Sequence, residues 1–107
     1  MDNWRLEHLK GLLKEDPKDE FVLYALAQEH TKHEQLHDAL SCYKELKFIN
    51  SDYVGMYYHL AALYIDLEQD TEAKATFEQG IEVAKRLGDH HALGELMNAK
   101  TNFELGI

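Results

Sequence analysis

The chain has 107 residues, 45% of them hydrophobic and 29% charged, and its formal net charge is −9. This mixture is typical of one globular domain with a modest core and differs from that of a disordered chain. The excess of carboxylates repels phosphate backbones and anionic lipid headgroups, so we expect neither nucleic acids nor membranes as partners.

The cellular compartment is indicated by what the sequence lacks. A membrane-spanning helix needs roughly 20 apolar residues in a row, and the chain has no such run. Its amino terminus carries Arg5 and Glu7 where a signal peptide would have an apolar core. Its single cysteine, Cys42, cannot form an internal disulfide, which fits a reducing compartment. We therefore expect a cytoplasmic protein.

Apolar residues recur at helical spacing along the chain, and interruptions of this pattern divide it into six expected helices. The first ends before Pro17, because proline cannot continue a helix. The last begins after Gly88 and Asp89, which supply a helix stop and then an N-cap. In chain order the expected helices cover about residues 3–15, 19–32, 36–49, 53–67, 71–87 and 90–104.

A repeat of 34 residues relates two parts of the chain. The shift places Ala39 on Ala73 and Tyr43 on Phe77. The first unit contains Leu23, Leu26, Ala27, His30, Ala39 and Tyr43, and the second contains Tyr57, Leu60, Ala61, Tyr64, Ala73 and Phe77. These residues resemble the signature of the tetratricopeptide repeat, W-x2-L-G-x2-Y followed by A-x3-F and a proline. The four alanines would let paired helices approach closely, and the large residues would fill the space around them.

The resemblance implies an all-α fold, a tetratricopeptide-type right-handed superhelix of antiparallel helix pairs with about six helices. We expect one domain, residues 1–107. It would consist of an N-terminal half-repeat helix at 1–19, repeats at 20–53 and 54–87, and a C-terminal capping helix at 88–107.

Six positions depart from the family pattern, and two of them, Ser51 and Lys85, replace its terminal proline. His30 stands where an aromatic residue is usual, and Gly80 replaces a small side chain within a helix. Glu34 and Glu68 occupy a turn position at which family members often carry glycine. We expect looser turns and local packing at these positions, with the helix pairs unchanged.

Members of this family use the first helix of each pair to line a concave groove, so the resemblance implies a protein-interaction module that binds a peptide or helix of a partner. It would be a non-catalytic scaffold or adaptor. The implied groove residues are Phe21, Tyr24, Gln28 and Lys32 from one repeat and Tyr58, Ala62 and Ile65 from the next. The aromatic residues among them suit an interface. In the competing interpretation, the aromatic rings belong to the core.

One subset of the family grips a peptide carboxylate with lysine and asparagine side chains. The matching positions here hold Tyr24, Gln28, His59, Asp89 and Leu93, and Asp89 would repel a carboxylate. We therefore expect no carboxylate clamp, and instead an apolar or aromatic ligand whose basic residues meet the acidic surroundings.

Two alternatives compete with partner binding. The first is self-association, giving a homo-oligomer through the ends of the array around Trp4, Leu96 and Phe103. The second, more remote, is a metal site built from His30, His33 and His37, whose spacing matches no metalloprotease helix. The sequence contains no enzyme motif and implies no cofactor; Cys42 lies in mid-helix, where we expect a packing residue.

Overall fold

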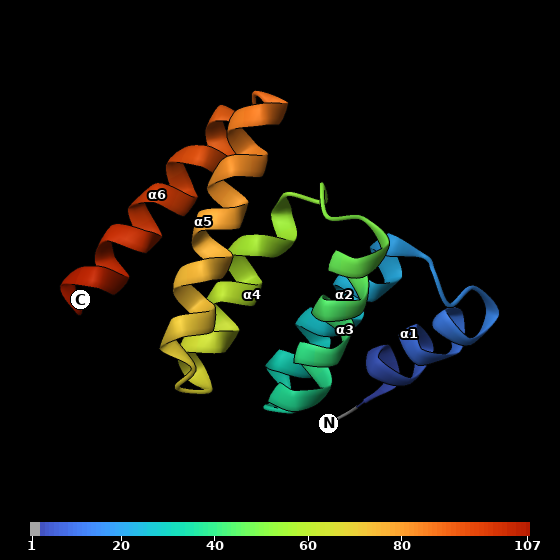
Figure 1. The fold of residues 1–107 in the computed structure, drawn as a ribbon. Helices are drawn as coiled ribbons and strands as arrows, with labels where there is room; N and C mark the ends of the chain where they lie inside the picture. Colours follow the sequence, from blue (N-terminus) through green and yellow to red (C-terminus); the bar gives the residue numbers. More distant parts are fainter. Residues whose placement is uncertain (1–2) are drawn as a thin grey trace. The chain divides into compact units, whose positions relative to one another are not determined.

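The computed structural model describes residues 3–107, which form six α-helices and no β-strand (Figure 1). The helices are α1 (Trp4–Glu15), α2 (Glu20–Lys32), α3 (Leu36–Ile49), α4 (Gly55–Asp66), α5 (Asp70–Leu87) and α6 (His90–Leu105). The predicted all-α fold is confirmed, and the helix boundaries differ from those expected by at most two residues. None of the helices within 3–107 combines the length and the apolar character that crossing a bilayer requires.

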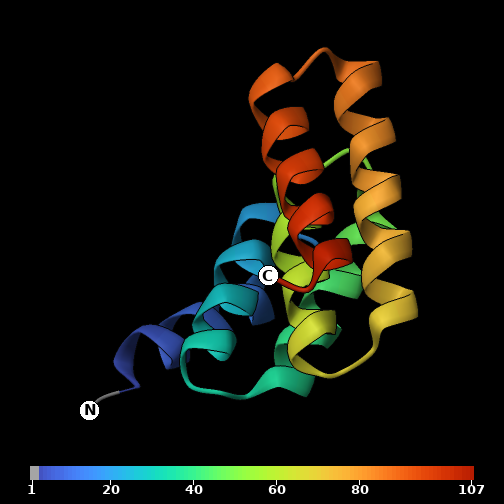
Figure 2. The same ribbon diagram turned by 90° about the vertical axis from the view of Figure 1, so that its left-hand side faces the viewer.

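The chain divides into two compact units, Met1–Ser51 and Asp52–Ile107. In the first unit α2 pairs with α3, and α1 packs against α2. In the second unit α4 pairs with α5, and α6 packs beside α5 and also contacts α4 (Figure 2). Each unit is therefore a helix pair with one additional helix.

The core of each unit follows the repeat pattern. Ala27 and Ala39 in the first unit, and Ala61 and Ala73 in the second, are all 0% exposed. The large residues predicted to surround them are also buried: Leu23, Leu26, Tyr43, Tyr57, Leu60 and Phe77. The alanines lie at the helix contacts because a methyl group is the largest side chain that such close packing accommodates.

Gly80 lies on α5 where that helix approaches α4 and α6. A Cβ atom added to Gly80 would lie 2.6 Å from Cβ of Tyr57 and 3.1 Å from Cδ1 of Leu96. The prediction of looser packing at this position is wrong, because the missing side chain is what lets the three helices approach so closely.

The turns at Glu34 and Glu68 are also well formed. Both residues have φ = 60°, in the left-handed region that favours glycine. The backbone amide of the following residue donates to the carbonyl oxygen five residues earlier, with an N–O distance of 2.8 Å in both turns. Gly88 and Gly106, with φ of 71° and 74°, close the ends of α5 and α6 with the same hydrogen bond at 2.9 and 3.0 Å. The two glutamates therefore adopt a glycine-type turn rather than a looser one.

Candidate functional site

The predicted groove residues of the first repeat lie on α2. Helical spacing places Phe21, Tyr24, Gln28 and Lys32 along one face of this helix. The Phe21 side chain is 65% exposed, so it is not part of the core. Tyr24 is half-buried, whereas Gln28 and Lys32 are exposed. This face of α2 thus presents one exposed aromatic ring followed by polar groups.

The predicted groove residues of the second repeat lie on successive turns of α4. The Tyr58 side chain is 42% exposed, Ala62 is exposed, and Ile65 is half-buried. All three line one pocket of about 590 Å³ within the second unit. The structure therefore brings these three residues together around a single hollow.

The remaining walls of this pocket come from α5, α6 and the residues that follow α6. They are Phe77, Glu95, Asn98, Ala99, Asn102, Phe103, Gly106 and Ile107. The rings of Phe77 and Phe103 lie 5.9 Å apart between centroids and are tilted by 45°, a favourable aromatic arrangement. The pocket thus combines apolar surface with three polar side chains on α6.

Negative charge and carboxamide groups determine the electrostatics of this pocket. Neither lysine nor arginine is among its lining residues, and Glu95 supplies a carboxylate. Glu95 pairs with His91 one turn earlier on α6, with an N–O distance of 3.4 Å. His59, beside Tyr58 on α4, is half-buried. Burial lowers the pKa of His59, and the negative charge of Glu95 partly opposes this shift.

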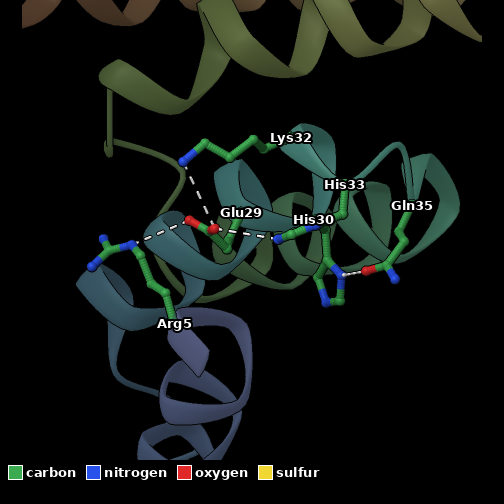
Figure 3. A network of polar contacts seen from close by, with 6 residues as sticks. All are labelled: Arg5, Glu29, His30, Lys32, His33 and Gln35. Atoms are coloured by element: carbon green, nitrogen blue, oxygen red, sulfur yellow. Dashed lines mark hydrogen bonds and ion pairs between the residues drawn. The ribbon is translucent and has the colours of Figure 1, made fainter. Parts of the chain in front are cut away.

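A network of polar contacts joins α1 to α2 in the first unit (Figure 3). The carboxylate of Glu29, which is 8% exposed, accepts from Nε of Arg5 at 3.1 Å. Its other oxygen lies 3.9 Å from Nζ of Lys32 and 3.4 Å from Nε2 of His33. This buried carboxylate is therefore surrounded by positively charged or ionisable partners.

The histidines proposed as metal ligands have other roles. His30 is 6% exposed, and its Nδ1 lies 2.7 Å from Oε1 of Gln35. His33 faces Glu29, and His37 is exposed at the start of α3. The part of the chain that the structure describes contains no group of three or more histidine, cysteine or carboxylate side chains suited to a metal ion. The metal alternative is thus unsupported.

The residues considered for self-association and for nucleophilic chemistry are placed as follows. Trp4 is 70% exposed, whereas Leu96 is 1% exposed and packs inside the second unit. Leu96 is thus unavailable to a second copy, and Phe103 lines the pocket.

Burial, with a smaller contribution from Asp38, raises the pKa of the Cys42 thiol to about 11. The buried Cys42 is therefore a protonated packing residue at neutral pH.

Glu95, Asn98 and Asn102 line the pocket but were not among the groove residues expected from the sequence. The helix that carries them matches the repeat signature poorly, and the family pattern reaches only its first turns, at Asp89 and Leu93. One signal was present in the sequence: Asn98 and Asn102 are four residues apart and therefore lie on one face of α6.

Comparisons with known proteins agree with this architecture. A family model described as "Tetratricopeptide repeat" matches residues 54–89. The crystal structure of a tetratricopeptide repeat domain protein from Salinibacter ruber is 48% identical in sequence, with a TM-score of 0.76, over 80% of this chain and 96% of that one. The solution structure of such a protein from the same organism is also 48% identical, with a TM-score of 0.77, over 81% and 88%.

A more distant structure shows the fold alone. The crystal structure of MamA is 15% identical, with a TM-score of 0.70, over 95% of this chain and 70% of that one. The comparison with curated proteins yields no match. The repeat pattern, the helix pairs and the 48% identity to a tetratricopeptide repeat domain protein lead to one conclusion: this chain belongs to the tetratricopeptide repeat family.

Proposed function

We propose that this protein is a non-catalytic scaffold or adaptor of the cytoplasm that binds a segment of a partner protein. Domains of its family generally mediate protein–protein interactions. The observation that carries the proposal is the pocket of the second unit, in which Tyr58, Ala62 and Ile65 meet aromatic residues of α5 and α6. Concave surfaces with apolar walls and a few polar groups are typical binding sites.

The chemistry of the pocket suits an apolar or aromatic side chain of the partner. Covering an exposed ring such as Tyr58 removes apolar surface from water, and burying one large apolar side chain contributes about 1.5–3 kcal/mol. The ring also offers a hydroxyl group that can form a hydrogen bond at the rim. Binding of this kind needs no catalytic group, and no enzyme activity is part of the proposal.

We include Phe21, Tyr24, Gln28 and Lys32 of α2 as a second contact surface for the same partner. The exposed ring of Phe21 is the group here that would gain most from being covered, because it is 65% exposed in the free protein. The α2 surface is tested separately from the pocket, so that each can fail without the other.

The test begins with a photo-crosslinking amino acid at position 58, compared with the same residue at position 48. Phe48 is 86% exposed on α3, outside both proposed surfaces, and is the matched control. A partner crosslinked from position 58 and not from 48 would be identified by mass spectrometry, purified, and titrated by calorimetry against the wild type and variants.

We expect the double variant Tyr58→Ser with Ile65→Ser to bind the purified partner at least about tenfold more weakly than the wild type, equivalent to about 1.4 kcal/mol of binding free energy. Phe21→Ser should reduce the affinity for the partner by a smaller factor, and Phe48→Ser should leave this affinity unchanged. Circular dichroism would verify that each variant stays helical. Equal affinity of the pocket variant and the wild type would contradict the proposal. Crosslinks from position 58 to a second copy of this chain would instead favour self-association.

A further inference from the structure

We propose that the pocket of the second unit takes an extended segment that places an apolar side chain in the pocket and a lysine or arginine beside Glu95. This inference rests on the proposed function and specifies the partner's chemistry. It rests on the charge of the pocket, on two carboxamides, and on two small residues in its lining.

Glu95 gives the pocket a negative charge. This carboxylate lies in a pocket whose lining has no lysine or arginine, within a chain of net charge −9. Its pairing with His91 is weak, because the two side chains are 54% and 85% exposed. A cationic side chain of a partner would therefore be attracted, and an acidic one repelled, by the same group.

The two carboxamides favour an extended segment over a helix. Asn98 and Asn102 both line the pocket, and residues four apart on a helix have Cβ atoms about 5–6 Å apart. Alternate residues of an extended chain repeat at about 6.4–6.8 Å. Within residues 3–107 neither carboxamide makes a side-chain hydrogen bond, so both can donate to and accept from a main chain. Groups inside a helix are already paired and offer no such partners.

Small residues leave room for the apolar side chain. Ala62 of α4 and Ala99 of α6 line the pocket, with Phe77 and Phe103 also in its lining. Two methyl groups in place of larger side chains leave a hollow bordered by aromatic surface. A leucine or methionine side chain is of suitable size and gains from contact with these rings.

The test measures binding of blocked peptides to the intact chain by fluorescence anisotropy. The probes are three acetylated, amidated and fluorescein-labelled eight-residue peptides that alternate leucine with lysine, glutamine or glutamate. Blocked termini remove the free carboxylate. A fourth probe has the leucine–lysine composition arranged on one helical face, with α-aminoisobutyrate to enforce a helix.

We expect the leucine–lysine peptide to bind about tenfold more tightly than the leucine–glutamate peptide, and more tightly than the helical probe. Glu95→Gln should weaken binding of the leucine–lysine peptide about threefold and leave binding of the leucine–glutamine peptide unchanged. Glu82→Gln, which removes the same charge from α5 outside the pocket, should change neither. The double variant Asn98→Ala with Asn102→Ala should weaken binding of all three extended peptides by the same factor.

Three outcomes would overturn the inference. They are equal loss of leucine–lysine binding in Glu95→Gln and Glu82→Gln, no effect of the asparagine substitutions, or tighter binding of the helical probe. If any of these occurs while Tyr58→Ser with Ile65→Ser still releases the crosslinked partner, the proposed function stands and the inference on the partner's chemistry fails. If that variant still binds the partner, the pocket is not the binding site and the proposed function fails as well.

Discussion

The two units place the polar groups of their additional helices in contrasting surroundings. In the first unit α1 packs on α2, and the buried carboxylate of Glu29 is paired with Arg5 of α1 at 3.1 Å. In the second unit α6 packs beside α5 and contacts α4, and its carboxamides face a pocket of about 590 Å³. In the first unit the polar groups between the helices are paired with each other, whereas in the second unit they line a pocket that a partner can reach.

This difference separates stability from binding. A buried carboxylate is costly unless it is paired, so Glu29 contributes to the attachment of α1 only through its partners. Exposed groups such as Glu95 and Asn98 are hydrated in the free protein and contribute little to folding. They become useful when a partner replaces the water. We therefore expect substitution of Glu29 to affect unfolding, and substitution of Glu95 or Asn98 to affect binding.

The largest expected effect concerns the close packing of the second unit. Gly80→Ala should destabilise the protein by about 1–3 kcal/mol, because its Cβ would overlap Tyr57. Gly94→Ala in α6 is the matched control, since nothing lies within 4 Å of an added Cβ there. It should stabilise the protein by about 0.5–1 kcal/mol through helix propensity. Urea unfolding followed by circular dichroism measures both. Equal effects of the two substitutions would show that Gly80 is not needed for the helix contact.

The next prediction compares the two carboxylates directly. Glu29→Gln should lower the free energy of unfolding by about 1 kcal/mol and increase hydrogen exchange in α1, because Arg5 loses its charged partner. Glu95→Gln should change the free energy of unfolding by less than about 0.5 kcal/mol. Hydrogen exchange with mass spectrometry locates the change. Unaltered exchange in α1 of the Glu29 variant would mean that apolar contacts alone hold this helix.

A smaller gain is expected at the two glutamate turns. Glu34→Gly and Glu68→Gly should each stabilise the chain by about 0.5–1 kcal/mol, because glycine adopts φ = 60° without the cost that a side chain incurs. The gain is reduced by the greater freedom of glycine in the unfolded chain. Thermal unfolding of the single and double variants tests this, and additive gains are expected because the turns lie in separate units. A loss of stability would show that the glutamate side chains contribute contacts that outweigh the backbone cost.

The smallest expected effect is a pH dependence of the second unit. Burial lowers the pKa of His59 in the folded protein, so the unfolded chain takes up a proton first as the pH falls. Stability should therefore decrease as the pH drops below about 6.5, the usual histidine value. His59→Gln should reduce this decrease between pH 7.5 and 5.5, whereas His91→Gln, with an 85% exposed side chain, should not. Urea midpoints at both pH values provide the measurement. An undiminished slope in the His59 variant would assign the dependence to other groups.

The local pattern of the chain determined its helices and the seam of each helix pair. The 34-residue recurrence of alanine and large apolar residues is sufficient for this, because helix packing needs small and large side chains at fixed spacing. Buried Ala39 and Tyr43, and their counterparts Ala73 and Phe77, follow directly from that pattern. The periodicity of α4 also places Tyr58, Ala62 and Ile65 on one face of that helix, and all three line the pocket.

Only the tertiary structure decided what surrounds those residues. The repeat signature says little about α6, so Asn98 and Asn102 could be assigned to the pocket only once α6 was placed against α4 and α5. The same is true of Gly80, whose missing side chain appeared as a weakness in the sequence but permits contact with Tyr57. Periodicity determines which face of a helix is apolar, because that depends on neighbours along the chain. Which partner covers that face depends on distances between segments far apart in sequence, and these arise only on folding.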